Sequence, residues 1–183
     1  MSDDWLARLS TVLPPPDAPI VGEVTWEAVA GTLGIRFPPD FRRLVDTYGS
    51  GWVGDELNIA SPRATAFPDW AAPPLDAIRD VEPEGADSPL PAYPAPGPSL
   101  LPIASNGNGD YLFMVVTDGV ADESRLWLGN IRNIMWQLVL GPVSRLLVDV
   151  LTSGRTAEDI IANFGDFAWT PNATFTPKAL DGT

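Results

Sequence analysis

Helical periodicity, interrupted by two prolines, is the clearest pattern in the first third of the chain. From Trp26 to Leu33 apolar residues recur at i, i+3, i+4 and i+7, which is one face of a helix. Thr25 can cap this run at its start, and Gly34 suits a left-handed residue at its end. The same spacing returns in Phe41, Leu44, Val45 and Tyr48, between Pro39 and Gly49. Because Pro38-Pro39 forbids one continuous helix, we predict two short helices whose apolar faces share one core.

Two further helices are predicted near the ends of the chain. Residues 2–13 carry one apolar stripe, with acidic residues near the start and three prolines after the last residue. Gly141-Pro142 precedes a Leu-rich periodic run, which we expect to end at Gly154. Residues 66–81 are ambiguous, and their pattern favours a short helix after Pro73-Pro74.

Between these helices the pattern changes to that of strands. The expected strands are Leu57–Ala60, Leu100–Ala104, Tyr111–Thr117, Leu126–Leu128 and Ile134–Leu140. The third of them is continuously apolar, which is typical of a central strand buried on both faces. Turn residues at 105–110 and at Asp118-Gly119 join the strands closely, and closely joined strands pair antiparallel. We therefore predict an α+β fold, a mostly antiparallel sheet with helices packed on one face.

Length and proline content suggest how the chain is organised. At 183 residues a single domain over residues 1–183 is expected. Residues 82–98 contain six prolines, which exclude a helix or a central strand, so we interpret them as an extended surface loop. A proline-rich recognition segment is the alternative. Residues 171–183 lack periodicity and are expected to form a loosely attached tail.

Composition excludes several kinds of site. The chain has no Cys and no His, which removes disulfides, thiol nucleophiles, histidine bases and His or Cys metal sites. Eleven basic against 24 acidic residues give a net charge of −13, which repels nucleic acid and anionic membranes and attracts basic partners. No secretory signal and no run of about 20 apolar residues is present, so we expect a soluble, cytoplasmic protein.

Two groups of polar residues resemble chemical sites. Asn106, Asn108 and Asp110 alternate as in a calcium loop, but the positions that should be Gly and Glu hold Tyr111 and Thr117. We expect a tight turn in which Asp110 bonds local backbone N–H groups. A histidine-free glycosidase would need two facing carboxylates about 5–9 Å apart. The available candidates are Asp55-Glu56, Asp69 and Asp122-Glu123. Nothing in the sequence pairs them across a cleft, so we predict no catalytic residue, cofactor or metal.

Residues 50–56 offer a different kind of surface. The segment directly after the second predicted helix contains several glycines, one large aromatic side chain and two carboxylates. Trp52 either packs under the edge of the sheet or serves as a partner anchor ringed by polar groups. Asp55 and Glu56 are expected to face solvent.

Several motifs resemble those of the SUKH superfamily of bacterial immunity proteins and related fungal cell-wall regulators. They are Leu33-Gly34, Phe37–Phe41, Tyr48–Gly51, the Pro102–Asp110 turn, Trp136 and the Leu-rich last helix. The similarity covers roughly residues 24–155, and the N-terminal helix and the proline-rich insert depart from it.

The resemblance implies a non-enzymatic immunity protein that occludes a cognate toxin, commonly a nuclease, through an acidic surface. The expected partner-binding residues are Trp52, Asp55, Glu56, Asp122 and Glu123, with the carboxylates on loops that meet a basic toxin domain. The alternatives are a regulatory or scaffolding protein with a non-toxin partner, and a carboxylate enzyme.

Overall fold

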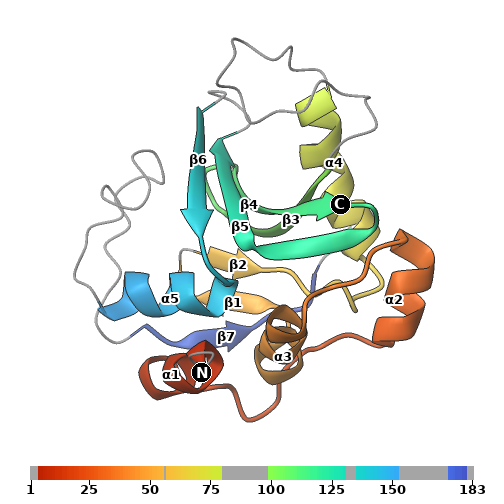
Figure 1. The fold of residues 1–183 in the computed structure, drawn as a ribbon. Helices are drawn as coiled ribbons and strands as arrows, with labels where there is room; N and C mark the ends of the chain where they lie inside the picture. Colours follow the sequence, from red (N-terminus) through yellow and green to blue (C-terminus); the bar gives the residue numbers. More distant parts are fainter. Residues whose placement is uncertain (1–3, 56, 80–98, 131–134, 153–172, 181–183) are drawn as a thin grey trace.

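A seven-stranded antiparallel sheet carries most of the fold (Figure 1). The computed structural model describes residues 4–55, 57–79, 99–130, 135–152 and 173–180. The helices are α1 Trp5–Val12, α2 Trp26–Leu33, α3 Pro39–Tyr48, α4 Phe67–Arg79 and α5 Val143–Thr152. The strands are β1 Gly51–Val53, β2 Leu57–Ile59, β3 Ser99–Asn106, β4 Asp110–Thr117, β5 Val120–Asn130, β6 Met135–Leu140 and β7 Phe175–Pro177. The prediction of an α+β fold is confirmed.

The first helices begin and end as their local signals predict. The Thr25 hydroxyl accepts a hydrogen bond from the Ala28 N–H at 3.2 Å, and Gly34 is left-handed with φ 67°. Pro39 occupies the first turn of α3, where no intrahelical N–H is needed. The two helices meet at the side chain of Trp26, whose indole N–H donates to the Asp46 carboxylate at 3.0 Å.

The sheet runs in the order β6-β5-β4-β3-β2-β1-β7, and every neighbouring pair is antiparallel. Helices α1, α3 and α5 pack against one another and lie below β3 to β6 in Figure 1, near β1 and β7, and α4 contacts β3. The main hydrophobic core fills the space between this helical layer and the sheet. Its largest fully buried side chains are Leu9, Leu13, Phe41, Leu44, Tyr48, Ile59, Phe67, Ile103, Leu112, Met114 and Leu126.

Two predicted boundaries are wrong. Helix α4 begins at Phe67 and contains both Pro73 and Pro74, although proline was expected to precede the helix. Phe67 and Ala71 are buried in the main core, and this packing favours a helical turn that begins before the prolines. Strand β5 begins at Val120, six residues before the predicted start, because Asp118 and Gly119 form a tight turn with positive φ angles of 50° and 72°.

The predicted loose tail is also wrong where the structure describes it. Strand β7 pairs with β1, and the Lys178 N–H donates to the Ser50 carbonyl at 3.0 Å. The Phe175 ring is buried with its centroid 5.2 Å from that of Tyr48. This segment is too short to show periodicity, and its strand conformation comes from pairing with β1. The proline-rich insert, Glu56 and Gly154 lie outside the described residues. Within the described ranges, every helix is too short or too polar to cross a bilayer.

Candidate functional site

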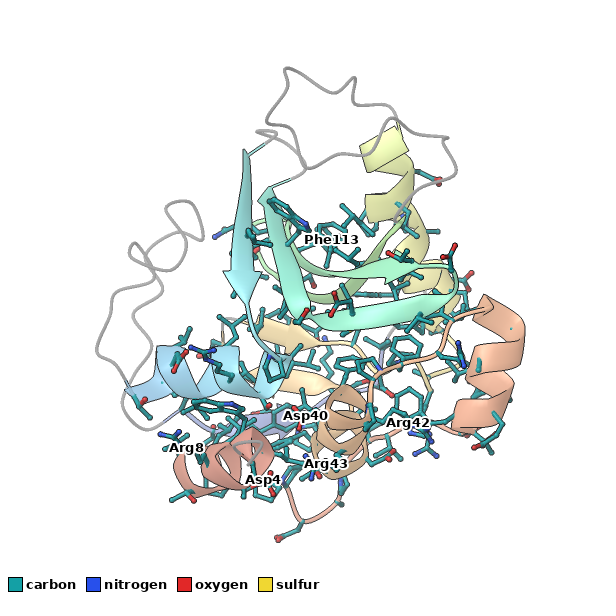
Figure 2. The ribbon with its side chains drawn as sticks, viewed as in Figure 1. Asp4, Arg8, Asp40, Arg42, Arg43 and Phe113 are labelled. Atoms are coloured by element: carbon teal, nitrogen blue, oxygen red, sulfur yellow. The ribbon has the colours of Figure 1, made fainter. Side chains whose placement is uncertain are left out.

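Strand β4 divides its side chains between the two faces of the sheet. Leu112, Met114 and Val116 belong to the main core. Phe113 and Val115 belong to a second, smaller cluster with Leu100, and Tyr111 and Trp127 pack against it. Figure 2 shows Phe113 on the sheet, well apart from the helical layer that holds Asp4, Arg8, Asp40 and Arg43. We call the side of the sheet that carries this second cluster the outer face.

Strand register extends the outer face across the sheet. Directly paired residues point to the same side, so Tyr111 shares its side with Ser105, which pairs with Asn58, which pairs with Trp52. Two residues further along β4, Phe113 pairs with Trp127 and Trp127 with Leu138. The outer face is therefore defined by Trp52, Asn58, Leu100, Ser105, Tyr111, Phe113, Val115, Asp122, Trp127 and Leu138.

Trp52 lies on this outer face and not in the main core. Its neighbours Gly51 and Val53 are buried toward the helices, while Trp52 is partly exposed between Asn58 and the exposed Thr176. The surroundings of Trp52 are those of a partly exposed aromatic side chain beside polar groups.

Asp55 is exposed in the turn between β1 and β2, as expected. Glu56 falls outside the described residues. Gly54, which directly precedes Asp55, has φ 58°, a conformation that suits glycine in such a turn.

Asp122 lies in strand β5 and not in a loop, so that prediction is wrong. Its pairing with Val115 places it on the outer face, where it is partly exposed. One carboxylate oxygen accepts from the Ser124 N–H at 2.8 Å and from the Ser124 hydroxyl at 2.6 Å. The pairing shifts after Met114, so β5 accommodates residues 123–125 as a bulge. The side chain of Glu123, also expected in a loop, is not among those described.

The two acidic positions do not face each other. Leu57, next to the Asp55 turn, pairs with Asn106 at one end of β3. Asp122 pairs with Val115, and Val115 pairs with Leu100 near the other end of β3. Three strand spacings and most of the length of β3 separate them, on the order of 20 Å. A glycosidase would need a separation of about 5–9 Å, so Asp55 and Asp122 do not form such a pair.

The polar turn between β3 and β4 is stabilised by hydrogen bonds among its own residues. The Asn106 side-chain oxygen accepts from the backbone N–H groups of Asn108 and Asp110, both at 2.9 Å. The Asn106 amide in turn donates to the buried Asp110 carboxylate at 2.7 Å. The predicted tight turn is confirmed, and within it the Asn106 side chain accepts two backbone N–H groups.

Sequence reasoning missed the aromatic members of the outer face. Tyr111, Phe113 and Trp127 occur in apolar runs that predict burial on both sides of the sheet. The outward alternation is hidden because the alternate positions are also apolar. Trp70 of α4 extends this aromatic group, with its ring centroid 6.1 Å from that of Tyr111.

A comparison with protein families gives one match. Residues 21–145 match the model of the SMI1 / KNR4 family (SUKH-1). The matched segment includes α2 to α4, β1 to β6 and the first residues of α5, and it excludes α1 and β7. No curated protein and no solved structure matches the sequence.

Proposed function

Because the chain belongs to the SMI1 / KNR4 family (SUKH-1), we propose that it is a non-enzymatic binding protein that neutralises a cognate bacterial toxin. The observation that carries the proposal is the composition of the outer face. Trp52, Tyr111 and Trp127 are partly exposed there, Leu138 is 43% exposed, and Asp122 lies on the same face. Aromatic anchors beside charged groups are typical of protein interfaces.

The charge of the chain favours a basic partner. A net charge of −13 attracts the basic surface with which a nuclease holds its substrate, and it repels nucleic acid itself. Such steering accelerates association and weakens as salt rises. We propose that Trp52, Asp55, Glu56, Asp122 and Glu123 contribute to the interface. The separation of Asp55 from Asp122 means that one partner must span most of the outer face to meet both.

The test is a calorimetric titration of the full chain with the toxin domain encoded beside its gene. We expect a Kd of about 10 nM or lower at low salt, and a Kd at least about tenfold higher in 500 mM NaCl. Asp55→Asn and Asp122→Asn should slow association, because each removes a negative charge at nearly constant size. Glu27→Gln is the matched control, since Glu27 is an exposed carboxylate on α2 and not on the sheet.

A flat titration with an active toxin domain contradicts the toxin-neutralising role. If no toxin gene adjoins this one and a different protein binds the same face, the regulatory or scaffolding alternative replaces it.

A further inference from the structure

The two edges of the sheet differ in how well they resist pairing with another strand. Among the described residues, β7 ends one side and β6 ends the other. Strand β7 has three residues, and the last is Pro177, which has no N–H to donate. Strand β6 has six residues, Met-Trp-Gln-Leu-Val-Leu, without proline or charge. Short length, proline and charge are the usual protections of an edge strand, and β6 has none of them.

The register of β6 shows which backbone groups face outward. The Gly141 N–H donates to the Ser124 carbonyl at 3.0 Å, so these two residues form a hydrogen-bonded pair. In an antiparallel ladder such pairs alternate with non-hydrogen-bonded ones. Leu140 pairs with Arg125 and Leu138 with Trp127, and both are therefore non-hydrogen-bonded pairs. Their N–H and C=O groups point away from β5, toward the edge at which β6 is the last strand among the described residues.

Leu138 adds an apolar side chain at the centre of this edge. It is 43% exposed, which is the largest exposure among the large apolar side chains of the described residues. A strand added beyond β6 would place a side chain next to Leu138 on the outer face and remove apolar surface from water.

We propose that β6 is a homodimer interface, on which a second copy of this chain pairs its own β6 in antiparallel register. A two-fold axis near Leu138 sets Leu138 beside the same residue of the second copy. Because β7 is blocked, β6 cannot pair with β7 of another copy, so the contact closes as a symmetric dimer and does not propagate. Because β6 carries no charge, it offers no attraction to a basic segment, which favours the uncharged β6 of a second copy. Each chain has a net charge of −13, and salt screens the repulsion between the two copies.

The experiment is sedimentation velocity of the full chain from about 1 µM to about 500 µM, the range in which small interfaces dissociate. We expect a concentration-dependent monomer–dimer equilibrium that shifts toward dimer between 50 and 500 mM NaCl, the opposite of the expected toxin response. Leu138→Lys should weaken the dimer at least about tenfold by placing like charges at the axis. Val120→Lys is the matched control, since Val120 is 42% exposed but lies at the start of β5.

Three results would overturn the dimer. One is a monomer at every concentration, and another is a dimer that Leu138→Lys leaves unchanged or that Val120→Lys weakens equally. The third is a monomeric chain in which the toxin domain protects the Leu138 and Leu140 amides from hydrogen exchange, which would assign the edge to the toxin. If no dimer forms, the proposed toxin binding still stands, because the calorimetric titration measures it separately from the sedimentation experiment.

Discussion

The Asp40 carboxylate and the Ser144 hydroxyl join the first turns of α3 and α5, with 2.6 Å between the two oxygen atoms. The other Asp40 oxygen accepts from the Arg43 guanidinium at 2.8 Å, and Arg43 also lies 3.8 Å from Asp4, which caps α1. Asp40 therefore joins α3 to α5 directly, and Arg43 extends the connection to Asp4 at the start of α1 (Figure 2).

Asp40→Ala should destabilise the fold by about 1–3 kcal/mol, because it leaves the fully buried Ser144 hydroxyl without this acceptor. Urea denaturation followed by circular dichroism measures the change. Asp149→Ala is the control, since it removes only an exposed pair with Arg145 and should cost about 0.5 kcal/mol or less. Equal losses in the two variants would show that the link between the helices is energetically unimportant.

Gly119→Ala should lower stability by about 2 kcal/mol. Gly119 has φ 72°, and a Cβ atom there would lie 2.7 Å from the carbonyl oxygen of Gly34. The same close approach lets the Arg36 N–H donate to the Gly119 carbonyl at 2.8 Å, which ties the α2–α3 connection to the β4–β5 turn. Gly107→Ala has open space around the new methyl group and should change the unfolding midpoint little. A neutral Gly119→Ala would mean that this turn moves freely.

The buried phenol of Tyr48 leads us to expect that the folded state loses stability at alkaline pH. Burial raises the pKa of its phenol, and a hydrogen bond with Ser10 partly opposes that rise. The phenol also donates to the Leu13 carbonyl at 2.6 Å. The unfolded chain loses this proton near pH 10 while the folded chain keeps it, so the stabilisation is complete below about pH 10 and falls as the pH rises further. Tyr48→Phe should be less stable at pH 7 but lack this part of the alkaline decline. Parallel curves for the two proteins from pH 8 to 11 would refute the assignment.

Phe175→Ala tests whether β7 supports the core. Phe175 is buried against Tyr48, so its truncation should cost about 3–4 kcal/mol by leaving a cavity beside the ring. Thr176→Ala, at the next and exposed position, should stay within about 0.5 kcal/mol of the parent chain. Thermal unfolding of both variants gives the comparison, and a small effect of Phe175→Ala would make β7 dispensable.

Trp52→Ala should weaken toxin binding by at least about tenfold if Trp52 is an anchor of the interface. Its partial exposure and its position on the outer face mean that the core loses little apolar burial. The unfolding midpoint should therefore fall far less than in Phe175→Ala. A variant that binds the toxin domain as tightly as the parent chain would remove Trp52 from the proposed interface.

Local signals determined much of the first part of the fold. Thr25 caps α2, Gly34 ends it and Pro39 opens α3, as their side chains and backbone preferences predict. The buried run at β4 and the turn at Asn106–Asp110 were equally predictable, because each depends on residues close together in the chain. The boundary of α4 was not, because the helix begins at residues that pack into the main core, Phe67 and Ala71, and this packing depends on segments distant in the chain.

By itself, the sequence determined the class of fold, the caps of the helices, the central strand and the net negative charge of the chain, all of which follow from neighbouring residues or from composition. Only the tertiary structure decided that Trp52 and Asp122 share one face while Asp55 lies at the far end, and that Phe175 completes the sheet beside Gly51. The reason is physical: strand order and register depend on pairing between distant segments, and a shift of one residue moves every side chain to the opposite face.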